Sequence, residues 1–109
     1  MLLSSCVVET SGPRPTPVDP QQALEQRVSL ARQYIGSGDW ENAKRNLELA
    51  AAIDGDNADV LEAFALVFQS TGEFERAEES FDAALAAGGG SRARNNYAAF
   101  LYSQGRYSD

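Results

Sequence analysis

Apolar and small residues recur along this chain at a spacing of 34 residues. Six positions of residues 30–43 return in residues 64–77, and a third copy runs from Tyr97 to Asp109, where the unit is incomplete. The matched pairs are Leu30 with Phe64, Ala31 with Ala65, Tyr34 with Phe68, Gly38 with Gly72, Trp40 with Phe74 and Ala43 with Ala77. A repeat of this length is typical of helical hairpins that stack into an array. The sequence therefore predicts an all-α fold, a helical-hairpin solenoid of about two and a half repeats.

Capping residues and glycines predict where the helices begin and end. Asp19 before Pro20 is typical of a helix start, because a carboxylate can cap free backbone N–H groups and proline suits the first helical position. Gly38 is expected to end this helix after about Ser37, since glycine readily adopts a left-handed conformation. The later helices are expected at about residues 40–53, 58–71 with Asp56 or Asn57 as the cap, 74–87, and 91–103 with Ser91 as the cap, before Tyr107 opens a sixth.

Small and large apolar residues are expected to divide the packing between them. Alanine permits two antiparallel helices to approach closely, and larger side chains fill the space between hairpins, because no hairpin can bury its apolar face alone. The alanines are Ala31, Ala43, Ala50, Ala65, Ala77, Ala84 and Ala98, and the large residues are Leu30, Tyr34, Trp40, Leu47, Phe64, Phe68, Phe74 and Phe81. On the last helix we expect Tyr97, Leu101 and Tyr107 to be exposed unless further sequence covers them.

Proline divides the chain into two segments. All four prolines lie within residues 1–22, which are predicted to form an extended, solvated tether. Residues 23–109 are predicted to form the repeat array, with repeats at about 24–57, 58–90 and 91–109, the last of them incomplete.

The composition argues against several classes of function. A net charge of −7 lacks the positive surface that nucleic acid or an anionic membrane would require. The absence of histidine and the presence of one cysteine remove the usual general base and the commonest metal ligands. We therefore predict no catalytic residue, metal, cofactor or small-molecule substrate, and a protein that is not an enzyme. The acidic residues Glu73, Glu75, Glu78 and Glu79 are expected to form a solvated helix face, and residues 88–90 a glycine linker.

In its repeated positions the chain resembles the tetratricopeptide repeat. The match runs from Leu24 to the end of the chain, with small, large and glycine positions all in register. The chain departs from the family pattern at Gly55 and Gly89, where proline is common, and its third copy follows after 33 residues. The resemblance implies the fold, but a repeat fold does not by itself name a function.

The start of the chain resembles a bacterial lipoprotein signal. Residues 3–6 read Leu-Ser-Ser-Cys, in which the cysteine would be lipidated and become the first residue of the mature protein. Three residues are too few for the apolar region of a signal peptide, so we expect this signal to be truncated. Val7 follows Cys6 where an inner-membrane retention signal would place aspartate, and the resemblance therefore implies the outer membrane. The alternative is that Cys6 is a stray cysteine in a tail.

A lipidated tetratricopeptide array is similar to the pilotin family of type IV pilus biogenesis. The likeness is closest in residues 65–69 and in residues 95–107. It implies a non-enzymatic outer-membrane lipoprotein scaffold at the periplasmic face, whose protein partners are the secretin subunits that it helps to localise and assemble. Two alternatives are an interaction module of another envelope assembly pathway and the N-terminal module of a longer enzyme.

In tetratricopeptide arrays the first helix of each hairpin lines a concave groove that binds peptides. By register, the positions expected there include Val28, Arg32, Ile35, Glu62, Leu66, Gln69, Asn95, Ala99 and Tyr102. An ordinary solvated helix face is the alternative. Asn95 and Asn96 could hold the backbone of a partner, or they could satisfy the start of the fifth helix.

Overall fold

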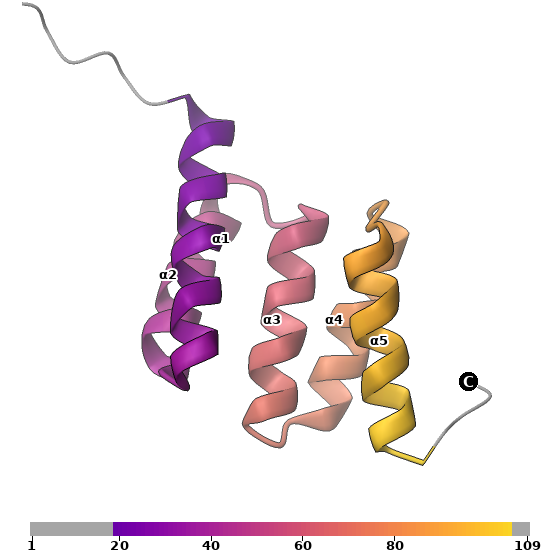
Figure 1. Cartoon of the computed structure of the whole chain (residues 1–109). Coiled ribbons are helices and arrows are strands. Elements are labelled where there is room, and N and C mark those ends of the chain that lie inside the picture. Colours follow the sequence, from indigo (N-terminus) through magenta and orange to yellow (C-terminus); the bar gives the residue numbers. More distant parts are fainter. Residues whose placement is uncertain (1–18, 106–109) are drawn as a thin grey trace, which may run out of the picture.

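The computed structural model describes residues 19–105, and every element in that range is a helix. The helices are α1 (Pro20–Ser37), α2 (Trp40–Ile53), α3 (Ala58–Ser70), α4 (Phe74–Ala86) and α5 (Ser91–Ser103). Helices α1 and α2 form one antiparallel hairpin, α3 and α4 form the next, and α5 packs beside the second (Figure 1). The predicted all-α helical-hairpin fold is confirmed. Residues 20–22, which the sequence division assigned to the tether, belong to α1.

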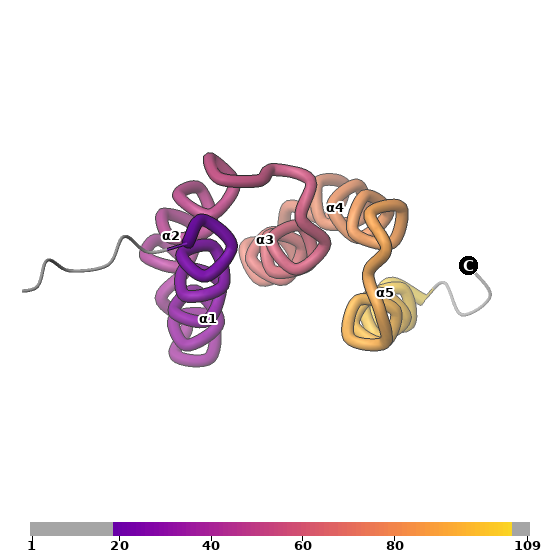
Figure 2. The backbone as a smooth tube through the Cα atoms, turned by 90° about the horizontal axis from the view of Figure 1, so that it is seen from above, coloured from indigo at the N-terminus to yellow at the C-terminus, as the bar shows by residue number. Residues whose placement is uncertain are grey.

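Seen from above, the helices form a shallow arch (Figure 2). Helices α1, α3 and α5 line its inner side, and α2 and α4 form its outer side. This arrangement places the first helix of every hairpin on one concave face, as the resemblance to tetratricopeptide arrays implies.

Local capping explains most of the helix boundaries. Asp19 accepts a hydrogen bond from the backbone N–H of Gln22 at 3.2 Å, which satisfies a donor left free at the start of α1. Gly38 ends α1 with a φ of 78°, a left-handed conformation that other residues adopt only at a cost. Asn57 caps α3, because its side-chain oxygen accepts hydrogen bonds from the backbone N–H groups of Asp59 and Val60. Of the two predicted caps, Asp56 and Asn57, the structure therefore selects Asn57.

The predicted cap of α5 is wrong. Gly90 is the capping residue, Ser91 is the first helical residue, and no side chain caps this helix. The physical reason is that the carbonyl of Gly90 already accepts the first helical hydrogen bond, from Arg94 at 3.1 Å. The preceding residue, Gly89, lies so close to α4 that a Cβ there would stand 2.8 Å from the Ala84 carbonyl oxygen.

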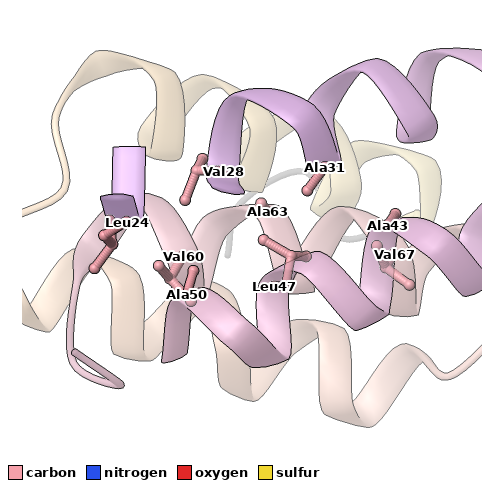
Figure 3. Close-up of a cluster of buried hydrophobic side chains, with 9 residues drawn as sticks. All are labelled: Leu24, Val28, Ala31, Ala43, Leu47, Ala50, Val60, Ala63 and Val67. Atoms are coloured by element: carbon pink, nitrogen blue, oxygen red, sulfur yellow. The ribbon is translucent and has the colours of Figure 1, made fainter. Parts of the chain in front are cut away.

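The first core cluster joins α1 and α2 to α3. It contains the buried residues Leu24, Val28, Ala31, Ala43, Leu47, Ala50, Val60, Ala63 and Val67 (Figure 3). Three of its alanines, at positions 31, 43 and 50, are fully buried, as expected where helices approach closely. Phe64 packs against this cluster and also against the next one, so that it joins the two hairpins.

The second cluster attaches α5 to the preceding hairpin. Its buried members are Ala65, Phe68, Ala77, Phe81, Phe100 and Leu101. The ring of Tyr97 stacks on Phe81 with centroids 5.1 Å apart, and Phe100 lies 5.6 Å from the same ring. The expectation that Leu101 would be exposed is therefore wrong, because α5 turns this side chain into the cluster, where it is 8% exposed. Tyr107 lies outside the described residues.

Two residues expected to fill space between hairpins are exposed instead. Leu30 is 36% exposed, and Phe74 is 45% exposed. Leu30 corresponds to Phe64, which packs toward the preceding hairpin, and no described element precedes α1. Phe74 lies at the first position of α4, and its ring lies beside that of Phe100 with centroids 6.2 Å apart. Trp40 is half-buried and packs against the first cluster.

Two glycines near the end of α1 should respond oppositely to replacement by alanine. A Cβ at Gly36 would meet no atom within 4 Å, so Gly36→Ala should stabilise the helix by about 0.5–1 kcal/mol. Gly38→Ala should destabilise the fold by about 1–2 kcal/mol, because alanine must then adopt a positive φ. Urea denaturation followed by circular dichroism measures both changes. Equal shifts of the two midpoints in one direction would contradict this account of the α1 terminus.

Candidate partner-binding face

The inner side of the arch carries a hollow of about 280 Å³ between α1, the start of α3 and the start of α5. Its lining residues are Gln21, Leu24, Glu25, Val28, Ser29, Arg32, Asn57, Asp59 and Arg92. Two arginines and two acidic residues therefore face the same space. Because both signs of charge are present, the hollow suits a ligand with mixed polar groups more than a simple anion.

The other half of this inner side is more apolar. Residues three or four positions apart lie on the same face of a helix. By this spacing, the face that lines the hollow continues toward the C-terminal ends of α1, α3 and α5 with Ile35, Leu66, Ala99 and Tyr102. Tyr102 is 69% exposed, whereas Ile35 and Leu66 are half-buried. We call the hollow together with these four residues the concave face. It offers charged groups at one end and apolar side chains at the other.

The residues predicted for the groove differ in their accessibility. Asn95, Ala99 and Tyr102 are exposed, and Arg32, Ile35, Leu66 and Gln69 are half-buried. Val28 and Glu62 are buried, with exposed fractions of 6% and 1%. Val28 still lines the floor of the hollow, whereas Glu62 lies beneath the concave face and can act on a partner only through its neighbours. Contact between a partner and the accessible residues stays a prediction.

Glu62 is the buried centre of a polar network on the inner side of the arch. Its Oε1 accepts a charge-assisted hydrogen bond from Nη2 of Arg32 on α1 at 2.6 Å. Its Oε2 accepts a bond from Nδ2 of Asn96 on α5 at 2.5 Å. The three side chains come from three successive repeats, and we call them the Glu62 network.

The Glu62 network gives Asn96 a role other than the two considered for the asparagine pair. Asn96 is half-buried and donates to Glu62, and no side chain caps α5. Asn95 is exposed and remains available on the concave face. No sequence signal marks this network directly, because the third copy follows after 33 residues and its register therefore matches Glu62 with Asn95, not with Asn96.

One acceptor near the apolar end of the concave face is left without a partner. The Oε1 atom of Gln69 is buried and makes no hydrogen bond within the described chain. Buried acceptors are satisfied in most folded proteins, so this amide oxygen is an exception within residues 19–105.

Perturbed carboxyl groups do not mark a catalytic site here. A side-chain hydrogen bond from Asn42, strengthened by its backbone N–H, lowers the pKa of Asp39 at the start of α2. A hydrogen bond from the Thr71 hydroxyl lowers the pKa of Glu73 just before α4. Both carboxyl groups lie at helix starts, and their hydrogen bonds stabilise the local backbone there.

Across residues 19–105, no three side chains of histidine, cysteine, aspartate or glutamate gather as metal ligands would.

Comparison with known proteins identifies the relatives of the chain. It is 38% identical over 111 aligned positions to the type IV pilus assembly protein PilF of Pseudomonas aeruginosa, and the alignment includes 98% of this chain. The chain is similar to PilF along almost its whole length. It spans 43% of the length of that PilF sequence.

A solved structure supports the same relation. The structure described as a functional characterisation of Pseudomonas aeruginosa pilF matches with a TM-score of 0.78 and 38% identity, over 82% of this chain and 40% of the PilF chain. No protein-family model matches the chain. The predicted tetratricopeptide fold and the predicted kinship with type IV pilus proteins are both confirmed by the PilF matches. None of the helices within residues 19–105 has the length and apolar character needed to cross a membrane.

Removing Arg32 should be far more damaging than removing an exposed arginine. Arg32→Ala would leave the Glu62 carboxylate buried without its counter-ion, and we expect the free energy of unfolding to fall by about 3 kcal/mol. Arg76→Ala is the matched control, because Arg76 pairs with Glu73 at the surface and should contribute about 1 kcal/mol at most. Urea denaturation compares the two. Similar losses would show that Glu62 does not depend on Arg32.

Proposed function

We propose that this chain is a non-enzymatic scaffold of type IV pilus assembly, which binds a protein partner on its concave face. The homology to PilF, which is named a type IV pilus assembly protein, is the observation that carries this proposal. The arch adds physical support, because α1, α3 and α5 present one continuous inner side along which a peptide segment can lie.

The chemistry of the concave face suits an extended or helical peptide. Tyr102 is a large exposed side chain with a polar tip, and aromatic anchors of this kind dominate many interfaces. Leu66 and Ile35 provide an apolar floor beside it. Arg32 and Arg92 can contact carboxylates or carbonyls at the other end. The partner would therefore insert apolar side chains near Tyr102 and place polar groups in the hollow.

We infer that the partner is a secretin subunit and that the protein works at the outer membrane, on its periplasmic face. The resemblance to pilotins supports this partner. The lipoprotein-like residues 3–6 support an anchor on Cys6, which lies outside the described residues. A single acyl chain binds membranes only marginally, so stable attachment would require a cysteine that carries more than one chain. The prolines of residues 1–22 would then separate the anchor from α1.

Substitutions on the concave face should weaken partner binding. Tyr102→Ala should lower the affinity for a purified secretin fragment at least about tenfold, which corresponds to about 1.4 kcal/mol. Because this side chain is mostly exposed, the variant should remain folded. Glu79→Ala is the control, since Glu79 is exposed on α4, a helix of the outer side. Isothermal titration calorimetry measures both affinities. Equal affinities of Tyr102→Ala and wild type would contradict this binding site.

Lipidation of Cys6 can be tested separately. In the full-length protein, produced in a Gram-negative host, mass spectrometry should detect acyl chains on Cys6, and Cys6→Ala should move the protein from the membrane fraction to the soluble fraction. Ser11→Ala, which lies outside the lipoprotein-like residues 3–6, serves as the control and should stay in the membrane fraction. Recovery of an unmodified Cys6 thiol would defeat the anchor hypothesis.

A further inference from the structure

The Glu62 network links α1, α3 and α5, which belong to three successive repeats. Packing within a hairpin joins only the two helices of that hairpin. Each oxygen of one carboxylate binds a different neighbour, Arg32 on α1 at 2.6 Å and Asn96 on α5 at 2.5 Å. Glu62 itself is 1% exposed. A single buried group on α3 therefore bonds to both neighbouring helices of the inner side.

The repeat pattern does not require these residues. At the register position of Glu62 the other repeats carry Val28 and Asn95. At the register position of Arg32 they carry Leu66 and Ala99. The array therefore accepts other side chains at the same register positions. The network is a feature of the middle repeat and of the two helices beside it, and not of the repeat pattern.

Stability is a weak reason for a buried carboxylate at this place. Buried ion pairs lose solvation that their attraction repays only in part, and well-packed apolar side chains of similar volume are often as stable. Hydrogen bonds to a carboxylate are directional, whereas hydrophobic contact is not. The network therefore supplies geometry that apolar packing would leave less defined.

The same bonds also orient Arg32. Its side chain is 22% exposed and lines the hollow, while one of its N–H groups is held by Glu62. A guanidinium carries five N–H donors, so Arg32 keeps donors for a carbonyl or carboxylate of a partner. Without Glu62 this long side chain would be free to sample other rotamers.

We propose that Glu62 is a positioning residue, which sets the spacing of α1, α3 and α5 and holds Arg32 in place on the concave face. The effect on a partner rests on the function proposed above. The effect on helix spacing does not, and it can be measured on the chain alone.

Distances between spin labels on α1 and α5 provide the direct test. In a Cys6→Ala background, labels replace Gln26 and Arg94, two exposed residues on these helices. Double electron–electron resonance should give one narrow distance peak for the chain with an intact network. Glu62→Gln, which removes the charge but keeps the shape, should lose this single peak under conditions in which circular dichroism shows a folded protein.

A second variant separates geometry from stability. In Arg32→Met/Glu62→Leu/Asn96→Leu the whole network becomes apolar, so no buried charge is left alone. We expect this variant to keep its thermal midpoint and still to lose the narrow distance peak. If Glu62→Gln fails to fold, Asn96→Ala removes one of the two bonds and is measured in the same way.

The outcomes separate this proposal from the proposed function. An unchanged narrow peak in folded Glu62→Gln and in the apolar variant would overturn the positioning role. If the peak is lost and the secretin fragment binds Glu62→Gln or Asn96→Ala, which both keep Arg32, about tenfold more weakly, a change of about 1.4 kcal/mol, both proposals are supported. If the peak is lost and even the wild-type chain does not bind the fragment, the positioning role stands and the secretin partner is wrong.

Discussion

Close packing between successive helical hairpins is the constraint on which this structure depends. Fully buried alanines at positions 31, 43 and 50 let α1 and α2 approach each other, and no hairpin of this kind buries its remaining apolar surface alone. Phe64 lies between the first and second hairpins and contacts both core clusters. The rings of Phe81 and Tyr97 then attach α5 in the same direction. The arch follows from adding these interfaces one after another.

The concave face is a consequence of that order. Because each hairpin places its first helix on the inner side, α1, α3 and α5 present their side chains to one shared space. The hollow, the exposed ring of Tyr102 and the buried Glu62 network all belong to this space. A binding surface assembled from several repeats depends on their relative positions, and in this chain a buried carboxylate links three of them.

Features set by nearby residues could be predicted from the sequence. The caps at Asp19 and Asn57 and the helix end at Gly38 depend on local hydrogen bonds and backbone conformation, and the structure confirms all three. The cap of α5 was predicted one residue too late, because Gly90 already supplies the first helical acceptor. Each of these helix boundaries is set by residues within a few positions of it along the chain.

Features set by distant residues could not be predicted in the same way. Leu101 is buried because α5 rotates onto the second cluster, and the repeat pattern does not define that rotation. Glu62 is expected from its register to line the groove, yet its carboxylate is buried and binds Arg32 of α1 and Asn96 of α5, two residues that lie 30 and 34 positions away along the chain. The register assigns residues to one face of each helix, but it does not give the depth of each side chain on that face.

The central claim is that the concave face binds a protein partner, and nuclear magnetic resonance can test it most directly. An isotope-labelled chain is titrated with an unlabelled secretin fragment, and the shift of each backbone amide is followed. We predict that the largest shifts lie on α1, α3 and α5, at Arg32, Leu66, Ala99 and Tyr102. Shifts confined to α2 and α4, on the outer side of the arch, would contradict the account.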